Sequence, residues 1–495
     1  RISGRMDSLT KASALAGAVS MFTMIQYMRR GMTSVRANTK PVPRRTLTRV
    51  RVPMAKGAVA ISSSFDSGNI KVLDCTDTKD IKLEIHKEPF TEGTDKRHHF
   101  QWFYFRVANA KGKECKYRIT NAHAASFSPA YDGYKVAYSY DPSSASPTWT
   151  RVAETDYKPS KAGAEKELVW SFKSEQDSVW FAYFAPFSYE RHQSLIATCA
   201  KNPLAEASVI GSTLQGRPMD LIKIGEGDRK VWVIARQHPG ESMAEWFMDG
   251  FLKEIMSDSK EAKALRKGAT VYAVPNMNPD GSVLGHLRTN ACGANLNREW
   301  QSIPLYPGYV APSDERSPEV KSVLDKMIET GVDLFIDVHG DEQIDDNFFA
   351  GSQGIPHWSS RLEDLYVLLN HAVLKCTKEF QVGKGYGDDD DPTFRAKNSK
   401  KDEANLSVAS NHVAHRFDCL SATLEMPFKD TTKTADVKEG WNPVRAQGFG
   451  ASMVGAFVPL LPVLRGDIGE EGRQWLAHAK DELKDEGTDW YQEGK

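Results

Sequence analysis

The sequence predicts an α/β protein in which an N-terminal antiparallel β-sandwich precedes a second domain with a mixed sheet flanked by helices. At 495 residues the chain is longer than one hydrophobic core usually organises, so two domains are expected. Residues 59–199 contain β-branched and aromatic runs separated by turn clusters, which is typical of an all-β domain. After Asn202, strands alternate with helical patterns, which indicates a sheet covered by helices.

The sandwich is predicted to cover residues 56–200. Its strongest strand is FQWFYFRV at residues 100–107, whose two faces are both largely apolar, so we expect a central strand covered on both sides. Aromatic residues inside strands belong to a packed core more often than to a ligand platform. Further strands are expected at residues 134–140, 167–172 and 178–184.

The second domain is predicted to cover residues 201–465. Ser242 opens a helix that carries Met243 and Phe247 on one face, and Ser317 with Pro318 marks another helix start. Residues 446–464 are uncharged but contain two prolines, which favours a helix packed on the sheet over a membrane span. Strands are expected at residues 231–235, 269–275, 333–338 and 418–428, and helices at 363–380, 443–464 and 470–485, the last within a C-terminal helical tail of residues 466–495.

Residues 1–55 are expected to form a targeting or disordered tail outside the folded protein. Asp7 is the only acidic residue before Asp66, while Arg and Lys recur, which is typical of a targeting peptide. The uncharged residues 12–28 lie at the lower limit of length for a signal anchor and are diluted by Gly, Ser, Thr and Gln. A fragment, or a start site at Met32, is an alternative. The expected location is the cytoplasm, or the mitochondrion if the tail targets the protein there.

The overall charge and the cysteines exclude several classes of function. The formal net charge of -1 provides no field that would attract nucleic acid or an anionic membrane, so neither is expected as a partner. The six cysteines are widely spaced without a C-x-x-C pair, which argues against a disulfide framework and against a cysteine zinc site. Free thiols in a reducing compartment are expected.

A candidate metal site lies in the sequence QHPGE, which directly follows the apolar strand of residues 231–235. His238 and Glu241 are suited to bind one zinc ion at about 2 Å, with a third ligand from elsewhere and a fourth position for water. His339 is the obvious third ligand, because it also leaves the end of a strand, where open α/β sheets form their sites. A capping role for the pair and a structural role for His339 are the alternatives.

Polar residues after the next strand add candidates for substrate binding. NPDG at residues 278–281 forms a tight turn. Arg288 follows and supplies a guanidinium that can polarise a carbonyl, and Asn297 with Arg298 can hold a carboxylate. Each arginine, taken alone, could instead form a surface ion pair.

In this order the motifs resemble the zinc carboxypeptidase family, and within it the cytosolic carboxypeptidase branch, which joins a β-sandwich to the catalytic domain. The resemblance covers roughly residues 56–465 and includes LEMPF at residues 424–428. It implies one zinc ion per chain, Glu425 as general base and acid, and Arg288 as the group that stabilises the oxyanion. It also implies that Asn297 and Arg298 bind the terminal carboxylate of the substrate.

The chain departs from the family pattern in one respect. Pancreatic-type relatives place a mobile tyrosine shortly before the catalytic glutamate, whereas residues 399–406 read SKKDEANL and contain none. Tyr386 lies too far upstream to be assigned by motif, so the role of this tyrosine stays unassigned.

The function expected from the sequence is a zinc metallocarboxypeptidase that removes C-terminal residues from peptides or proteins. The resemblance suggests a preference for glutamate and for acidic tails such as those of tubulin. Arg416 is the only permanent cation close before the catalytic strand and is expected to bind the acidic side chain, unless it pairs with Asp418 or Glu403. An aspartoacylase-like amidohydrolase acting on N-acyl amino acids and a catalytically silent binding protein are the alternatives.

Overall fold

The computed structural model describes residues 58–92, 98–300, 311–382, 385–386 and 404–485. The chain divides into two units, residues 1–53 and residues 54–495. The first unit, and with it the expected N-terminal tail, lies outside the described residues.

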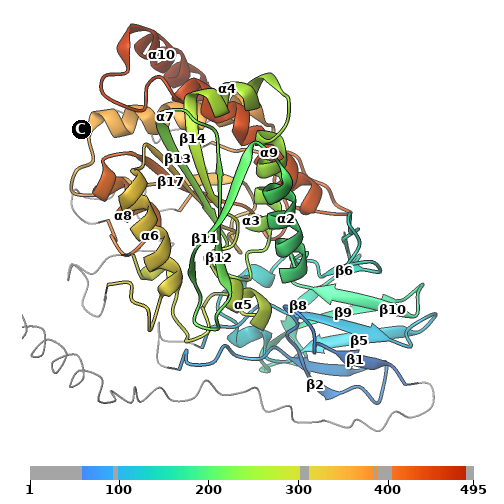
Figure 1. The fold of residues 1–495 in the computed structure, drawn as a ribbon. Helices are drawn as coiled ribbons and strands as arrows, with labels where there is room; N and C mark the ends of the chain where they lie inside the picture. The colour runs from blue at the N-terminus through green and yellow to red at the C-terminus, as the bar shows by residue number, and fades with distance from the viewer. Residues whose placement is uncertain (1–57, 93–97, 301–310, 383–384, 387–403, 486–495) are drawn as a thin grey trace, which may run out of the picture. The chain divides into compact units, whose positions relative to one another are not determined.

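Two five-stranded sheets form the N-terminal sandwich (Figure 1). Rings from both sheets meet between them: Tyr117 lies 5.0 Å from Phe181 and 5.2 Å from Trp170, centroid to centroid. The aromatic residues therefore form the core, as predicted. All strand pairs are antiparallel except β3 and β5, which run parallel. The first sheet has the order β1 (Ala60–Ser62), β4 (Tyr104–Ala108), β10 (Ser178–Ala182), β6 (Ala137–Ser139) and β7 (Thr150–Arg151), and the second β2 (Lys71–Asp74), β3 (Ile81–Glu84), β5 (Glu114–Ile119), β9 (Lys166–Lys173) and β8 (Asp156–Pro159).

Two features of this half differ from the prediction. The strand expected at residues 100–107 begins only at Tyr104, although it does lie centrally, between β1 and β10. The region expected to be all strand ends in a helix, α2 (Tyr189–Lys201). The Ser188 side chain caps this helix by accepting a hydrogen bond from the Arg191 amide, and Leu195 and Cys199 lie buried on one face.

A seven-stranded mixed sheet forms the second half. The four strands β14, β13, β15 and β17 run parallel, whereas β11, β12 and β16 are antiparallel to their neighbours. The sheet has the order β11 (Ala205–Ser212), β12 (Pro218–Ile224), β14 (Ala269–Val274), β13 (Arg229–Ala235), β15 (Leu334–Val338), β17 (Leu420–Glu425) and β16 (Phe348–Gly351).

Helices cover both faces of this sheet, because successive side chains of its central strands belong to two different cores. Val231 and Val233 of β13 pack into one core, and Trp232 and Ile234 into the other. The first core includes α3 (Met243–Ile255), α4 (Lys260–Gly268), α7 (Ser360–Cys376), α9 (Pro443–Phe457) and α10 (Gly469–Asp485), and the second includes α6 (Pro318–Thr330) and α8 (Ala409–Phe417).

Helices α3 and α9 approach each other closely through glycine. A Cβ atom added to Gly250 would lie 2.0 Å from the Gln447 carbonyl oxygen, and one added to Gly450 would lie 2.0 Å from that of Phe247. The predicted helix of residues 443–464 continues past α9 only as a short 3₁₀ turn, Val458–Leu460, because Pro459 lacks the amide donor. In the part of the chain that the structure describes, no helix has the length and apolar character needed to cross a membrane.

Candidate active site

His238, Glu241 and His339 converge at the carboxyl ends of β13 and β15. The Nδ1 atoms of the two histidines lie 3.2 Å apart, and they lie 2.6 Å (His238) and 2.8 Å (His339) from the two oxygens of the Glu241 carboxylate. Ligands around a tetrahedral zinc ion with bonds of about 2 Å lie about 3.3 Å from one another. The three side chains, which are all buried, therefore fit a zinc ion.

The Nε2 atom of each histidine, on the far side of the ring from Glu241, faces a hydrogen-bond acceptor, as is usual for histidines that bind a metal through Nδ1. Nε2 of His238 lies 3.0 Å from Oδ1 of Asn295, and Nε2 of His339 lies 2.9 Å from Oδ2 of Asp337. Both partners are acceptors, so with a metal ion bound each Nε2 would carry the hydrogen and each Nδ1 would present its lone pair to the ion. Burial, followed by the charge of Arg288, lowers the pKa of His238 to about 3, which favours the neutral ring.

Arg236 shapes the loop that presents His238 and Glu241. Its backbone adopts the left-handed conformation with φ of 61°, which is costly for a residue with a Cβ atom. The buried guanidinium compensates by donating to the carbonyls of Pro239 (3.0 Å) and Phe187 (2.7 Å) and to the Glu245 carboxylate (2.6 Å). Pro239 lies between His238 and Glu241, so this bond holds the ligand loop itself.

Glu425, the last residue of β17, lies in the same cavity. Tyr386 places its hydroxyl 3.0 Å from Oε1 of Glu425 and 3.0 Å from Oδ2 of Asp341. Oε2 of Glu425 is buried and has no hydrogen-bond partner among the described residues. Burial raises the pKa of Glu425 well above its ordinary value, and Glu241 and Asp341 act in the same direction. The carboxyl is thus suited to hold a proton beside the metal ligands.

The cavity has a volume of about 280 Å³ and contains most of the predicted site. Arg288 and Asn297 line it together with His238, Glu241 and Glu425. Three predicted residues do not: His339, which contacts Glu241 beside the cavity, Arg298 and Arg416. Arg298 is half-buried outside the lining, with its guanidinium donating to the Asn297 carbonyl at 2.8 Å. Arg416 is exposed on the last turn of α8, so the structure does not support the expectation of a buried arginine facing the substrate.

The sequence motifs did not identify two residues of the site, Tyr386 and Phe127. Tyr386 comes from a segment distant in sequence from Glu425, and Phe127 comes from the sandwich half and lines the cavity wall. The ring of Phe127 lies 5.4 Å from the Arg288 guanidinium, a distance suited to a cation–π contact. The sandwich therefore contributes directly to the cavity.

Glu88 of the sandwich holds the loop that carries Arg288. Its buried carboxylate accepts hydrogen bonds from the backbone amides of Leu287 (2.7 Å), Arg288 (3.0 Å) and Thr289 (2.9 Å), and from the Thr289 hydroxyl (2.6 Å). Four donors on one carboxylate define the path of the loop closely.

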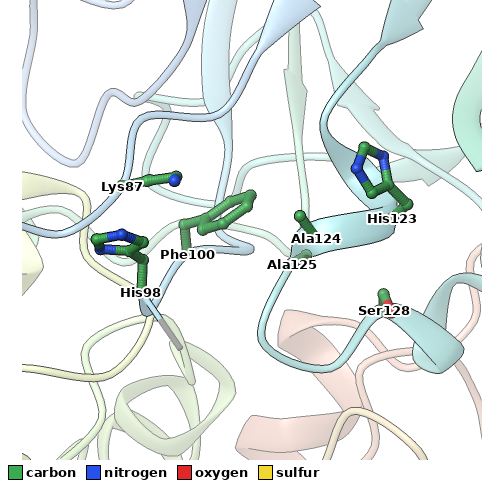
Figure 2. A pocket seen from close by; sticks show the side chains of 7 residues that line it. All are labelled: Lys87, His98, Phe100, His123, Ala124, Ala125 and Ser128. Carbon is green, nitrogen blue, oxygen red and sulfur yellow. The ribbon is translucent and has the colours of Figure 1, made fainter. Parts of the chain in front are cut away.

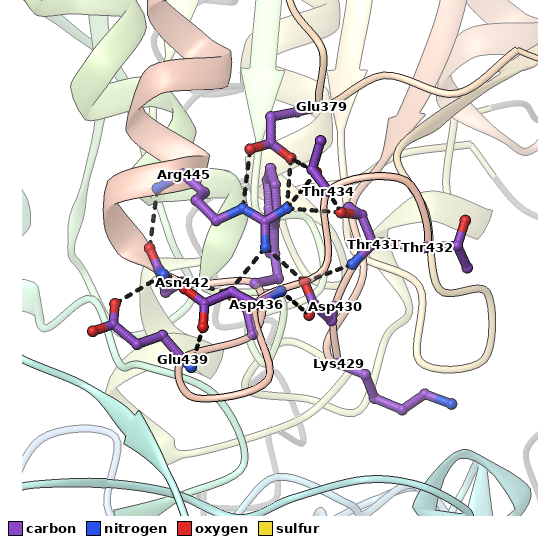
Figure 3. A network of polar contacts seen from close by, with 12 residues as sticks. Glu379, Lys429, Asp430, Thr431, Thr432, Thr434, Asp436, Glu439, Asn442 and Arg445 are labelled. Carbon is purple, nitrogen blue, oxygen red and sulfur yellow. Dashed lines mark hydrogen bonds and ion pairs between the residues drawn. The ribbon is translucent and has the colours of Figure 1, made fainter.

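The segment that follows Glu425 is anchored by two arginines. Arg151 of the sandwich donates to the Phe428 carbonyl at 2.6 Å. Arg445 of α9 binds Glu379 at 3.0 Å and Asp430 at 2.6 Å, in the network shown in Figure 3. The chain leaving β17 is therefore fixed on both sides, which keeps Glu425 in register with the ligands.

Two other features of the described chain are less suited to metal chemistry. A second cavity of about 390 Å³ lies in the sandwich, where Lys87, His98, His123 and Ser128 line it without a carboxylate among the described lining residues (Figure 2). His371 lies near His478 and Glu482, but its Nδ1 accepts a hydrogen bond from Trp475 at 2.9 Å and its Nε2 lies 2.7 Å from Glu482. Neither ring nitrogen of His371 is left for a metal.

Comparison with known proteins agrees with this geometry. The model of the zinc carboxypeptidase family matches residues 193–442, and that of the cytosolic carboxypeptidase N-terminal domain matches residues 61–184. The chain belongs to the zinc carboxypeptidase family. It is therefore a peptide hydrolase that uses zinc. An uncharacterized protein of Zymomonas mobilis is 39% identical over 412 residues, which cover 82% of this chain and 99% of that protein.

This zinc carboxypeptidase is also similar to named relatives and to solved structures. Human cytosolic carboxypeptidase 2 is 30% identical over 58% of this chain, and the match spans only 33% of the human protein. A putative carboxypeptidase A from Shewanella denitrificans has a TM-score of 0.72 at 43% identity, covering 81% of this chain and 98% of that one. A metallo-carboxypeptidase from Pseudomonas aeruginosa, solved with (2-guanidinoethylmercapto)succinic acid, has a TM-score of 0.72 at 37% identity, with coverages of 82% and 100%.

Proposed function

We propose that this zinc carboxypeptidase removes the C-terminal residue from peptides or proteins, with zinc held by His238, Glu241 and His339. The observation that carries the proposal is the convergence of these three side chains beside the cavity that Glu425 lines, where Oε2 of Glu425 has no hydrogen-bond partner among the described residues. When bound, zinc polarises the scissile carbonyl and lowers the pKa of the attacking water.

Glu425 is proposed to move the proton. Glu425 lines the cavity with His238 and Glu241, and its Oε2 has no hydrogen-bond partner among the described residues, so it can accept the proton of the attacking water and return it to the leaving amine. The Tyr386 hydroxyl has one hydrogen but lies 3.0 Å from two carboxyls, so one of the two contacts needs a protonated carboxyl. The raised pKa of Asp341, caused mainly by burial, is consistent with Asp341 carrying this proton, which leaves Glu425 able to act as the base.

Arg288 is proposed to stabilise the negative charge that develops on the carbonyl oxygen, since it is a cation in the cavity lining. Asn297 is proposed to bind the terminal carboxylate, whereas Arg298, which was expected to share this role, donates to the Asn297 carbonyl outside the cavity lining. Asn297 is fixed for this, because its Oδ1 accepts the Ala409 amide at 2.8 Å and its amide group remains near the cavity. A bound terminal carboxylate places the scissile bond one residue away, which defines an exopeptidase.

Glu88 should affect catalysis through Arg288. Glu88→Gln replaces one accepting oxygen by a donor, and because each charged hydrogen bond contributes about 1.5–3 kcal/mol, we expect kcat/KM to fall about 10- to 100-fold. In an Arg288→Ala background the same change should have little further effect, since the two residues act as a unit. Steady-state kinetics of the four proteins measures this coupling.

Asn69→Ala serves as the matched control for Glu88→Gln, because the Asn69 amide also joins the sandwich to this loop, at the Gly285 carbonyl 2.9 Å away. It should lower the melting temperature and leave kcat/KM close to that of the parent. Additive losses for Glu88→Gln and Arg288→Ala would show that Glu88 does not act through Arg288.

A preference for C-terminal glutamate, and for acidic protein tails as partners, is the finer part of the proposal. It is supported by the similarity to cytosolic carboxypeptidases, whose name also supports a cytoplasmic location. The Pseudomonas relative was solved with (2-guanidinoethylmercapto)succinic acid, which carries a guanidino group as well as carboxyl groups and so does not by itself favour an acidic substrate. Since Arg416 lies outside the cavity, Arg288 is the cation that the described lining offers to an acidic substrate.

An amino-acid release assay on the zinc-loaded protein tests both the carboxypeptidase activity and the preference for C-terminal glutamate. Peptides that differ only in a C-terminal Glu, Phe or Lys should all be compared, together with an N-acyl amino acid. Release from peptides but not from the N-acyl amino acid is expected, with the highest kcat/KM for Glu. Release from the N-acyl amino acid alone would identify an amidohydrolase, and a preference for Phe or Lys would contradict the glutamate proposal.

A further inference from the structure

Glu342 lines the catalytic cavity but has no place in the reaction described above. Its side chain follows β15 and His339 by a few residues and is 5% exposed. Oε1 is buried without a hydrogen-bond partner among the described residues. The adjacent Asp341 differs in this respect, because its carboxylate is bonded by the Gln343 and Ile344 amides and by Tyr386.

The groups around Glu342 do not supply the missing partner. Burial, then the charges of Glu241 and Asp341, raise the pKa of Glu342 well above its ordinary value, and Arg288 opposes them. Arg288 instead lies over the ring of Phe127. Tyr183 of the sandwich also senses the charge of Glu342, but its hydroxyl forms no hydrogen bond to Oε1 of Glu342.

A buried carboxyl without a partner costs free energy, and in a binding cavity the natural partner arrives with the ligand. The complement of a carboxylate in a confined site is an ammonium or guanidinium group. We propose that Glu342 binds a cationic nitrogen of the substrate, supplied by its free α-amino group or by a basic side chain. This inference rests on the proposed peptidase function and defines its substrates as short peptides or peptides with a basic residue near the scissile bond.

The test compares matched peptides that differ only in charge. Tripeptides with one fixed C-terminal residue are offered with a free or acetylated N-terminus, and with lysine or Nε-acetyl-lysine next to the terminal residue. The parent should show a kcat/KM at least about tenfold higher for the cationic member of one pair, and the ratio should approach 1 in Glu342→Gln, which keeps the shape and removes the charge. The pair that responds identifies the source of the nitrogen.

Glu319→Gln is the control, because Glu319 is equally buried in α6 but lies outside the cavity lining. This variant should keep the parental ratios. A parent that cleaves both members of each pair equally well, or a Glu342→Gln variant that keeps the preference, would overturn the inference while the peptidase function stands.

A binding measurement makes the inference testable without turnover. Calorimetry should show that arginine binds the parent at least about tenfold more tightly than citrulline, its neutral analogue, and that Glu342→Gln removes the difference. If no peptide is cleaved but this selectivity is present, the peptidase proposal fails and the role of Glu342 stands. Equal binding of arginine and citrulline by the parent would contradict it.

Discussion

His339→Ala should lose most of its bound zinc. The substitution removes one of three protein ligands and leaves Asp337 without the imidazole it accepts from, so the metal keeps only His238 and Glu241. Removal of a supporting outer contact alone commonly costs 10–100-fold in metal affinity, and loss of a direct ligand should cost more. Elemental analysis after dialysis should give about one zinc ion per chain for the parent and far less for the variant.

The control for this variant is His371→Ala. His371 is also a buried histidine, but both its nitrogens are bonded to Trp475 and Glu482. Its replacement should lower stability and leave the zinc content unchanged. Equal zinc content in His339→Ala and the parent would exclude His339 from the metal site.

Glu425→Gln should retain zinc and lose nearly all activity. The amide has the size of the carboxyl and can still contact Tyr386, but it cannot accept the proton of the attacking water. General acid–base catalysis contributes about 10²–10⁴-fold, so kcat should fall by at least that factor while KM changes little. Metal analysis and steady-state kinetics on the same preparation separate the two effects.

Glu319→Gln serves here too as a matched change of a buried glutamate, and it should keep the parental kcat. Turnover by Glu425→Gln within about tenfold of the parent would remove Glu425 from the proton transfer, since a lost proton carrier costs more than that. Another group in the cavity would then have to carry the proton.

Those parts of the site that follow directly from strand ends could be predicted from the sequence. His238, Glu241, His339 and Glu425 each lie at or just after the carboxyl end of a parallel strand, and parallel strands bring those ends together at one edge of the sheet. The change from closely spaced strands to strands that alternate with helices likewise predicted the β-sandwich and the helix-covered mixed sheet. The local sequence pattern was sufficient to predict a site residue wherever the end of a sheet strand determines the position of that residue.

Residues placed by long-range packing could not be predicted in this way. Arg416 is near Glu425 in sequence, yet it lies on the last turn of α8, whose buried face is formed by earlier residues such as Val413. Tyr386, in contrast, is distant in sequence and reaches Glu425. Helix α2 was missed because it follows ten strands with no break in composition strong enough to mark its start.

The hydrogen bonds between Glu88 and the Arg288 loop join two segments that the ribosome makes at different times. Glu88 precedes the amides that it binds by 199 to 201 positions, so a ribosome releases the sandwich well before the loop. Of the residues assigned to chemistry, Glu425 emerges last. During synthesis the acceptor is therefore in place before its donors exist, and the candidate site stays incomplete until Glu425 has been translated.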